Sequence, residues 1–188
     1  MGRWEPNARG RLEEAALALY GERGYEQVTV AEIAARAGLT ERTFFRHYAD
    51  KREVLFAGSS LLREILVKGV AEAPDGAAPI EVVGAALAAA GAMLEERRDL
   101  ARQRQAVIDA NPELQEREVV KLATLATAVA GALRDRGVAE PAASLTAQAG
   151  TAVFAVAFSR WIGDTGRRHL PDLVRESFDE LRALTAEA

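Results

Sequence analysis

The sequence has no cysteine and only two histidines, His47 and His169, among its 188 residues. The absence of cysteine excludes a disulfide framework, a zinc site with cysteine ligands and catalysis by a thiol. Two histidines leave little for a histidine metal site or a catalytic triad, so we expect no cofactor, no metal and no enzymatic activity. Aromatic residues are also scarce (6%), whereas alanine supplies 39 residues. This composition favours helices and a core large enough to fold unaided.

The sequence also lacks a clear export or membrane signal. Residues 1–11 contain no apolar segment of the signal-peptide type. The most apolar stretch, residues 141–159, is uncharged but contains Ser, Thr, Gln and Gly, which makes it a weak membrane span. We therefore expect a cytoplasmic protein that does not enter a membrane.

Positive charge is scarce overall but concentrated near the N-terminus. The net charge of −4 argues against a wholly basic protein that coats nucleic acid. Residues 1–52 carry nine basic and eight acidic side chains, whereas residues 53–188 carry 15 and 20. Five basic and only two acidic residues lie within residues 36–52. That segment is either a local basic site or an ordinary solvated helix face.

Apolar residues recur at helical spacing along the chain, and no run alternates as a strand would. Thr29 and Glu32 have the spacing of a capping box, Thr40 is placed to cap the next helix, and Asp50 repeats this logic. Glycines and prolines mark most other boundaries. We predict an all-α protein with nine helices, over residues 8–23, 30–37, 41–48, 51–73, 80–96, 99–110, 112–136, 141–163 and 170–184.

The second and third of these helices have the features of a helix-turn-helix: both are short, the connection is tight, and the second is basic. Phe44 and Tyr48 lie four residues apart and suit its inner face. The complementary positions then point outward, and they are Glu41, Arg42, Phe45, Arg46 and His47.

The side chains at these outward positions are of types that can contact the bases, sugars and phosphates of DNA. The guanidinium of Arg42 can bind guanine O6 and N7, or a phosphate. Phe45 could pack on a sugar or a thymine methyl group, and the alternative is that it is half-tucked into the core of the first three helices. Free amides at the start of the fourth helix form a further candidate anion site. Four residues suit phosphate contacts, which fix the register: Thr40, Arg46, His47 and Lys51.

Residues 28–40, followed by Thr43-Phe44-Phe45-Arg46-His47-Tyr48 and Lys51, closely resemble the DNA-binding domain of TetR-family transcriptional repressors. The resemblance is dense over about residues 11–55, and the length and nine-helix pattern extend it over the whole chain. It implies a TetR-like fold and a homodimer. Residues 1–52 would form the DNA-binding domain, and residues 53–188 would bind a small inducer and dimerise.

The resemblance also implies roles for single residues. It assigns phosphate contacts to the helix starts at Thr29 and Thr40, and base reading to Arg42 and Thr43. Two residues depart from the family: Phe45 stands where a tyrosine often binds a phosphate through its hydroxyl, and Glu41 would repel a phosphate. The full predicted DNA-binding set is Thr29, Thr40, Arg42, Thr43, Phe45, Arg46, His47 and Lys51.

In this family the inducer pocket lies among the middle helices. Apolar residues there are candidates for its lining, and the alternative is that such a stripe belongs to the core. The segment 98–117 is similar to actinobacterial regulators associated with acyl-CoA or redox-cofactor pathways, so we expect a hydrophobic or acyl-CoA-like inducer. Clustered arginines (Arg97, Arg98, Arg102 and Arg104) would also suit an anionic ligand. The predicted ligand-binding residues are Met93, Arg104, Val107, Ile108, Phe154, Phe158 and Trp161.

The last two helices are the expected dimer interface, and the alternative is that their apolar faces are buried within the monomer. His169 is expected in a surface loop between them. The eighth helix has a small, uncharged face and the ninth an apolar stripe. The residues expected at the interface are Ala147, Gly150, Thr151, Ala155, Leu173, Val174, Phe178 and Leu181.

The sequence therefore predicts a ligand-responsive DNA-binding repressor that an inducer releases from a palindromic operator. An activator remains an open alternative. The rival from another class is a helical small-molecule-binding protein or enzyme that does not bind DNA. A structural helical adaptor would explain the last two helices but not the capped, basic helix pair.

Overall fold

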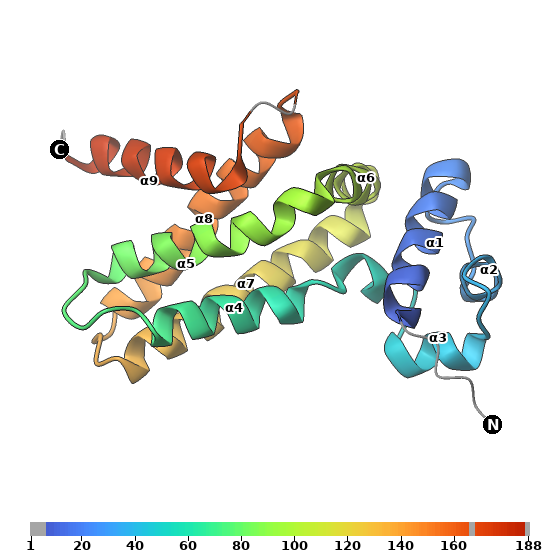
Figure 1. Ribbon diagram of the computed structural model, residues 1–188, viewed down its shortest axis with the longest axis horizontal. Helices are drawn as coiled ribbons and strands as arrows, with labels where there is room; N and C mark the ends of the chain where they lie inside the picture. Colours follow the sequence, from blue (N-terminus) through green and yellow to red (C-terminus); the bar gives the residue numbers. More distant parts are fainter. Residues whose placement is uncertain (1–6, 166–167, 187–188) are drawn as a thin grey trace. The chain divides into compact units, whose positions relative to one another are not determined.

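The computed structural model describes residues 7–165 and 168–186, and every regular element within them is helical (Figure 1). The all-α prediction is confirmed for this part of the chain. The elements are α1 (Ala8–Arg23), α2 (Val30–Arg36), α3 (Glu41–His47), the 3-10 helix η1 (Glu53–Phe56), α4 (Ser59–Ala71), α5 (Pro79–Leu94), the 3-10 helix η2 (Glu95–Arg97), α6 (Arg98–Asp109), α7 (Pro112–Asp135), α8 (Ala142–Gly163) and α9 (Leu170–Ala186).

The chain forms two compact units. The first, here called the head, comprises residues 1–58 and 102–118; the second, the body, comprises residues 59–101 and 119–188. The head therefore extends beyond the predicted boundary at residue 52 and includes most of α6 and the start of α7. The chain passes between the units at residues 58/59, 101/102 and 118/119.

Local capping explains why the head helices begin and end where they do. The Thr29 hydroxyl accepts a hydrogen bond from the Glu32 amide, and the Glu32 carboxylate accepts from the Thr29 amide, so the predicted capping box is confirmed. The Thr40 hydroxyl accepts from the Thr43 amide and caps α3. Gly38, between α2 and α3, has φ +66°, in the left-handed region that favours glycine.

The prediction of one long helix over residues 51–73 is wrong. The segment forms the four-residue η1, a turn, and then the 13-residue α4 from Ser59. Four consecutive side chains, residues 54–57, are all buried in the head core. An α-helix turns by about 100° per residue and cannot bury four successive side chains against one surface. Tertiary burial therefore overrides the helical pattern here.

The head core combines α1, α2 and α3 with residues from α6 and α7. Phe44 and Tyr48 are buried, as their spacing predicted, together with Ile33 and Leu12. Ile108 and Leu114 are fully buried in the same cluster. Residues 102–118 thus complete the core on which the helix-turn-helix rests.

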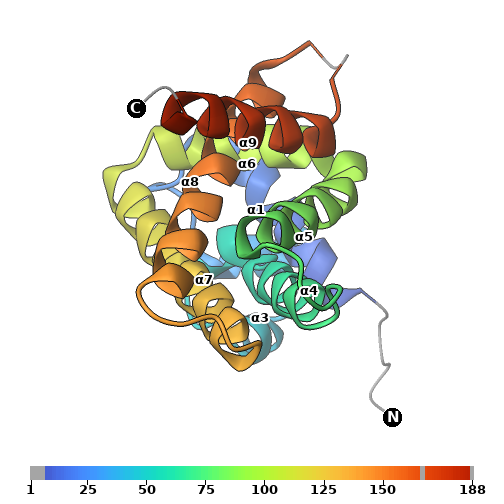
Figure 2. The same ribbon diagram turned by 90° about the vertical axis from the view of Figure 1, so that its left-hand side faces the viewer.

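In the body, α5 packs against α4, α8 and α9, and α8 against α9 (Figures 1 and 2). Glycines allow the helices to approach closely. A Cβ atom built at Gly150 of α8 would lie 2.4 Å from Cγ1 of Val83 on α5, and one at Gly91 would lie 3.1 Å from Cγ of Leu170 on α9. The small face of α8 therefore packs inside the body.

This packing corrects the residues expected at the dimer interface. Five of them are buried in the body: Ala147, Gly150, Leu173, Val174 and Phe178. The exposed face of α8 is uncharged and includes Ala155 from the expected set, together with Leu145, Ala152 and Val156. By length and composition alone α8 is apolar enough to span a membrane, and its inner face belongs to the body core.

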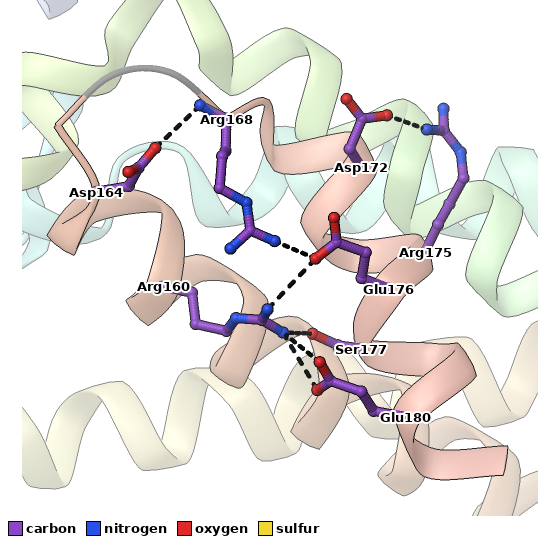
Figure 3. A network of polar contacts seen from close by, with 8 residues as sticks. All are labelled: Arg160, Asp164, Arg168, Asp172, Arg175, Glu176, Ser177 and Glu180. Atoms are coloured by element: carbon purple, nitrogen blue, oxygen red, sulfur yellow. Dashed lines mark hydrogen bonds and ion pairs between the residues drawn. The ribbon is translucent and has the colours of Figure 1, made fainter. Parts of the chain in front are cut away.

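A polar network also joins α8 to α9 (Figure 3). Arg160 on α8 donates to the Glu176 carboxylate (3.3 Å), the Ser177 hydroxyl (3.2 Å) and the Glu180 carboxylate (3.1 Å) on α9. Arg168 pairs with the same Glu176. Because these ion pairs are exposed to solvent, we expect them to fix the register of the two helices more than to stabilise the fold.

Candidate nucleic-acid interface

The outer face of α3 carries the side chains predicted to meet DNA. Buried Phe44 holds this short helix against the head core, so that Arg42, Phe45 and Arg46 project to solvent. Phe45 is 53% exposed, and its ring lies edge-on to Phe44 at 5.5 Å. The outward placement of these three side chains is confirmed.

Arg42 and Arg46 are the available cations of this segment. Neither makes a hydrogen bond or an ion pair with any residue in the described part of the chain. By contrast, Arg36 pairs with Glu22 of α1 at 2.6 Å, and Arg52 pairs with Asp50 at 2.7 Å. The basic cluster expected over residues 36–52 therefore contains paired cations, and the sequence does not indicate the Arg36 pair because Glu22 is distant along the chain.

Lys51 is also engaged within the head. Its Nζ donates to the carbonyl oxygens of Tyr25 (3.0 Å), Glu26 (3.3 Å) and Val28 (3.1 Å). The same ammonium lies 4.3 Å from the centroid of the Tyr25 ring. An ammonium has three N–H donors, so these carbonyl oxygens use all of them. Lys51 thereby fixes the loop that leads into α2.

The two predicted phosphate-binding threonines differ. The Thr29 hydroxyl donates to Glu32 Oε2 at 2.8 Å, so its proton is engaged in the capping box. A hydrogen bond from Arg23, followed by those from Thr29, lowers the pKa of Glu32 to about 2, which places a carboxylate beside Thr29. The Thr40 hydroxyl lies 3.1 Å from that of Thr43 at the exposed start of α3.

The candidate anion site at the start of the fourth helix is not supported. Asp50 Oδ1 accepts hydrogen bonds from the amides of Arg52 (2.8 Å) and Glu53 (3.1 Å). A carboxylate of the protein therefore already binds these amides. Asp50 does not cap a long helix as predicted, since the N-cap residue of η1 is Arg52, but its carboxylate occupies these amides and blocks an external anion.

His47 lies at the end of α3 and is partly buried. Its Nε2 is buried and has no hydrogen-bond partner among the described residues. Burial, together with the nearby charges of Arg46 and Arg9, lowers the pKa of His47 below its ordinary value of 6.5. The neutral imidazole is therefore favoured in the free protein.

The predicted ligand-binding residues fall into the two units. Val107 and Ile108 pack on the head core, and Ile108 is fully buried there. The Arg104 guanidinium donates to the Leu55 carbonyl oxygen (2.6 Å) and to Glu118 (3.1 Å), so it anchors α6 within the head. The structure therefore gives these three residues a place in the head rather than in the body with the other four.

The remaining candidates belong to the body. Phe154, Phe158 and Trp161 form a row along α8, with ring centroids 6.1 Å and 5.6 Å apart. Met93 is 48% exposed and does not belong to the body core cluster. Arg98, expected within a cluster of arginines, has its guanidinium 5.1 Å from the Trp161 ring centroid.

Two protein families match successive parts of the chain. Residues 12–57 match the family described as bacterial regulatory proteins, tetR family, and residues 77–186 match the family described as the MftR C-terminal domain. The TcmR transcriptional regulator of Streptomyces glaucescens is 36% identical over 81 residues, 43% of this chain and 36% of TcmR. MftR of Mycobacterium tuberculosis, named as a mycofactocin biosynthesis transcriptional regulator, is 29% identical over 116 residues, 61% of this chain and 58% of MftR. The chain thus aligns with less than two thirds of the length of either relative.

Solved structures show the same fold. The Thermus thermophilus repressor FadR, in complex with lauroyl-CoA, is 27% identical with a TM-score of 0.55, covering 91% of each chain. Bacillus subtilis FadR, in complex with stearoyl-CoA, is 19% identical with a TM-score of 0.63, covering 90% of this chain and 95% of that one. Because the two family matches together cover most of the sequence, the chain belongs to the tetR family of bacterial regulatory proteins and carries a C-terminal domain of the MftR type.

Proposed function

We propose that this protein is a ligand-responsive, sequence-specific transcriptional repressor that acts in the cytoplasm. The observation that carries the proposal is the outer face of α3, where Arg42 and Arg46 are exposed and unpaired within the described chain on either side of Phe45. A helix held by one buried face, with unpaired arginines on the other, is the arrangement that reads a major groove. The named relatives are transcriptional regulators, which supports regulation rather than catalysis.

The DNA contacts divide by chemistry. We propose that Arg42 and Thr43 read bases, and that Thr40 and Arg46 contact phosphates, with Phe45 packing on the sugar or on a thymine methyl group. His47 contacts the sugar-phosphate backbone of the DNA at the end of α3. Thr29 and Lys51 contribute mainly by holding α2 and its loop in place, because their donors are engaged within the head.

We further propose a homodimer formed through α8 and α9. The exposed, uncharged face of α8 around Leu145, Ala152 and Val156 supports this role for α8. The outer side of α9 is charged, with exposed pairs such as Arg175 with Asp172. The interface is therefore apolar along α8 and polar at its α9 rim. Two heads in a dimer would reach half-sites about 34 Å apart, one turn of DNA.

The inducer is proposed to bind in the body and to change the separation of the two heads. Its class, hydrophobic or acyl-CoA-like, is supported by the lauroyl-CoA complex of the related FadR repressor. Phe154, Phe158 and Trp161 are the proposed contacts. Residues 102–118 carry the signal, because they belong to the head while the chain on either side of them belongs to the body.

The test measures fluorescence anisotropy of a labelled palindromic DNA from the protein's own promoter, titrated with the protein and then with lauroyl-CoA. We expect salt-sensitive binding to the palindrome and release by lauroyl-CoA but not by free CoA. Absence of DNA binding would favour the helical small-molecule-binding protein or enzyme. Binding to the palindrome without release by lauroyl-CoA would retain the repressor and reject this class of inducer.

A further inference from the structure

Two buried N–H donors lie on neighbouring side chains of the body. The Trp161 Nε1 and the Arg98 Nε are both buried and have no hydrogen-bond acceptor among the described residues. Trp161 is 0% exposed, and the Arg98 guanidinium lies 5.1 Å from the centroid of its indole ring. Buried donors in folded proteins are nearly always paired, because an unpaired one loses its hydration without compensation. The two neighbouring side chains therefore each carry a donor that lacks an acceptor within the described chain.

Aromatic rings of α8 lie beside the Trp161 indole. Phe158 lies 5.6 Å from Trp161 between ring centroids, and Phe154 continues the row. Leu94 and Ala101 are only partly buried against the same core cluster. A molecule that reaches the donors would therefore place a hydrophobic portion against aromatic rings, as small-molecule sites with a few polar anchors generally do.

The charge of Arg98 is already balanced. Its Nη2 lies 3.6 Å from an Asp164 carboxylate oxygen. The terminal nitrogens also donate to backbone carbonyl oxygens at the end of α8 and beyond it, those of Trp161, Asp164 and Arg168. Only Nε remains unpaired. The site therefore does not require an anion, and a neutral carbonyl oxygen meets its need.

We propose that the body binds a small apolar molecule with a neutral carbonyl group, whose oxygen accepts hydrogen bonds from Trp161 Nε1 and Arg98 Nε. The hydrophobic part of the molecule packs on Phe158 and Phe154. This inference rests on the proposed function and specifies the chemistry of the inducer. Arg98 becomes a ligand-binding residue that also holds the end of α8.

The experiment follows the indole N–H directly by NMR. The sequence contains two tryptophans, Trp4 and Trp161, so the Trp4→Phe protein gives a single indole signal. The probes are 2-acetylnaphthalene, which has a ketone oxygen, and 2-ethylnaphthalene, which has nearly the same shape and no acceptor. We expect 2-acetylnaphthalene to move the Trp161 N–H resonance downfield and to bind about tenfold more tightly than 2-ethylnaphthalene.

The Trp161→Phe variant removes the donor and keeps an aromatic ring, and it should reduce the preference for the ketone to a small factor. Equal affinity of the two probes for the Trp4→Phe protein would overturn the proposal, as would an indole resonance that neither probe shifts up to its solubility limit. Operator binding by the Trp4→Phe protein distinguishes a failure of the carbonyl site from a failure of the proposed function. If the operator is bound and the indole is unmoved, the carbonyl site is wrong; if no operator is bound, the proposed function is wrong.

Discussion

The ammonium nitrogen of Lys51 lies 3.0 Å from the carbonyl oxygen of Tyr25, and it binds two further carbonyl oxygens of the same loop. The backbone at Lys51 is held as well, because the Tyr20 hydroxyl donates to its carbonyl oxygen at 2.8 Å. Lys51 therefore ties α1, the loop before α2 and the segment after α3 together. In the free protein it acts as a positioning residue for the helix-turn-helix.

This arrangement gives a prediction for the salt dependence of operator binding. Each phosphate contact contributes about 0.9 to the slope of log K against log salt. Lys51→Gln should weaken binding because the loop loosens, but it should leave the slope unchanged. Arg46→Gln, the matched control, should lower both the affinity and the slope. A Lys51→Gln slope reduced as much as that of Arg46→Gln would show that Lys51 leaves the carbonyl oxygens to bind phosphate.

The burial of Ile108 in the head core gives a prediction for stability. Ile108→Ala should cost about 2–5 kcal/mol of the free energy of unfolding of the head, since it leaves a cavity. Amide hydrogen exchange should then accelerate over residues 12–48, although these are distant in sequence. Gln103→Ala changes an exposed residue of the same helix and is the control. Unchanged exchange over residues 12–48 in the Ile108→Ala protein would contradict the assignment of α6 to the head core.

His47 gives a prediction for pH. Its pKa is lowered in the folded protein, chiefly by burial and then by Arg46 and Arg9, so the unfolded chain binds more protons once the pH falls to about 6.5. The contribution of neutral His47 to the free energy of unfolding is therefore fully present above that pH. It is lost as the pH falls toward the pKa of the folded protein. In urea titrations, wild type should lose more stability than His47→Gln between about pH 7 and 5. Parallel pH profiles for the two proteins would contradict this assignment.

The exposed face of α8 gives a prediction for oligomeric state. Val156 is 53% exposed there, and Val119 is 66% exposed on α7. If α8 forms the dimer interface, Val156→Asp should produce monomers by light scattering after size-exclusion chromatography. Val119→Asp introduces the same charge elsewhere on the body and should remain dimeric. A Val156→Asp protein with the mass of the wild-type dimer would place the interface elsewhere.

Local signals were sufficient to predict most of the fold. The caps at Thr29 and Thr40 depend on residues three positions away, and the spacing of Phe44 and Tyr48 defines the inner face of α3. The sequence therefore predicted these helices and the outward placement of Arg42, Phe45 and Arg46 correctly.

What could not be predicted depends on distant partners. Nothing near Arg36 in the sequence indicates that Glu22 pairs with it, and Lys51 binds carbonyl oxygens more than twenty residues away. The small face around Gly150 suits close helix packing either within one subunit or between two, and only the position of Val83 decides for the former. The assignment of Arg104 and Ile108 to the head likewise depends on tertiary packing.

The most direct test of the account measures the affinity of operator DNA for three single variants. Arg42→Ala and Arg46→Ala remove arginines that are unpaired on the outer face of α3, whereas Arg36→Ala removes an equal charge that Glu22 already neutralises. We predict that Arg42→Ala and Arg46→Ala weaken binding by about tenfold or more, in line with about 1–3 kcal/mol for a good base contact, and that Arg36→Ala changes it by only about twofold. Operator affinity equal to wild type in both the Arg42→Ala and Arg46→Ala proteins would contradict the claim that α3 reads the DNA.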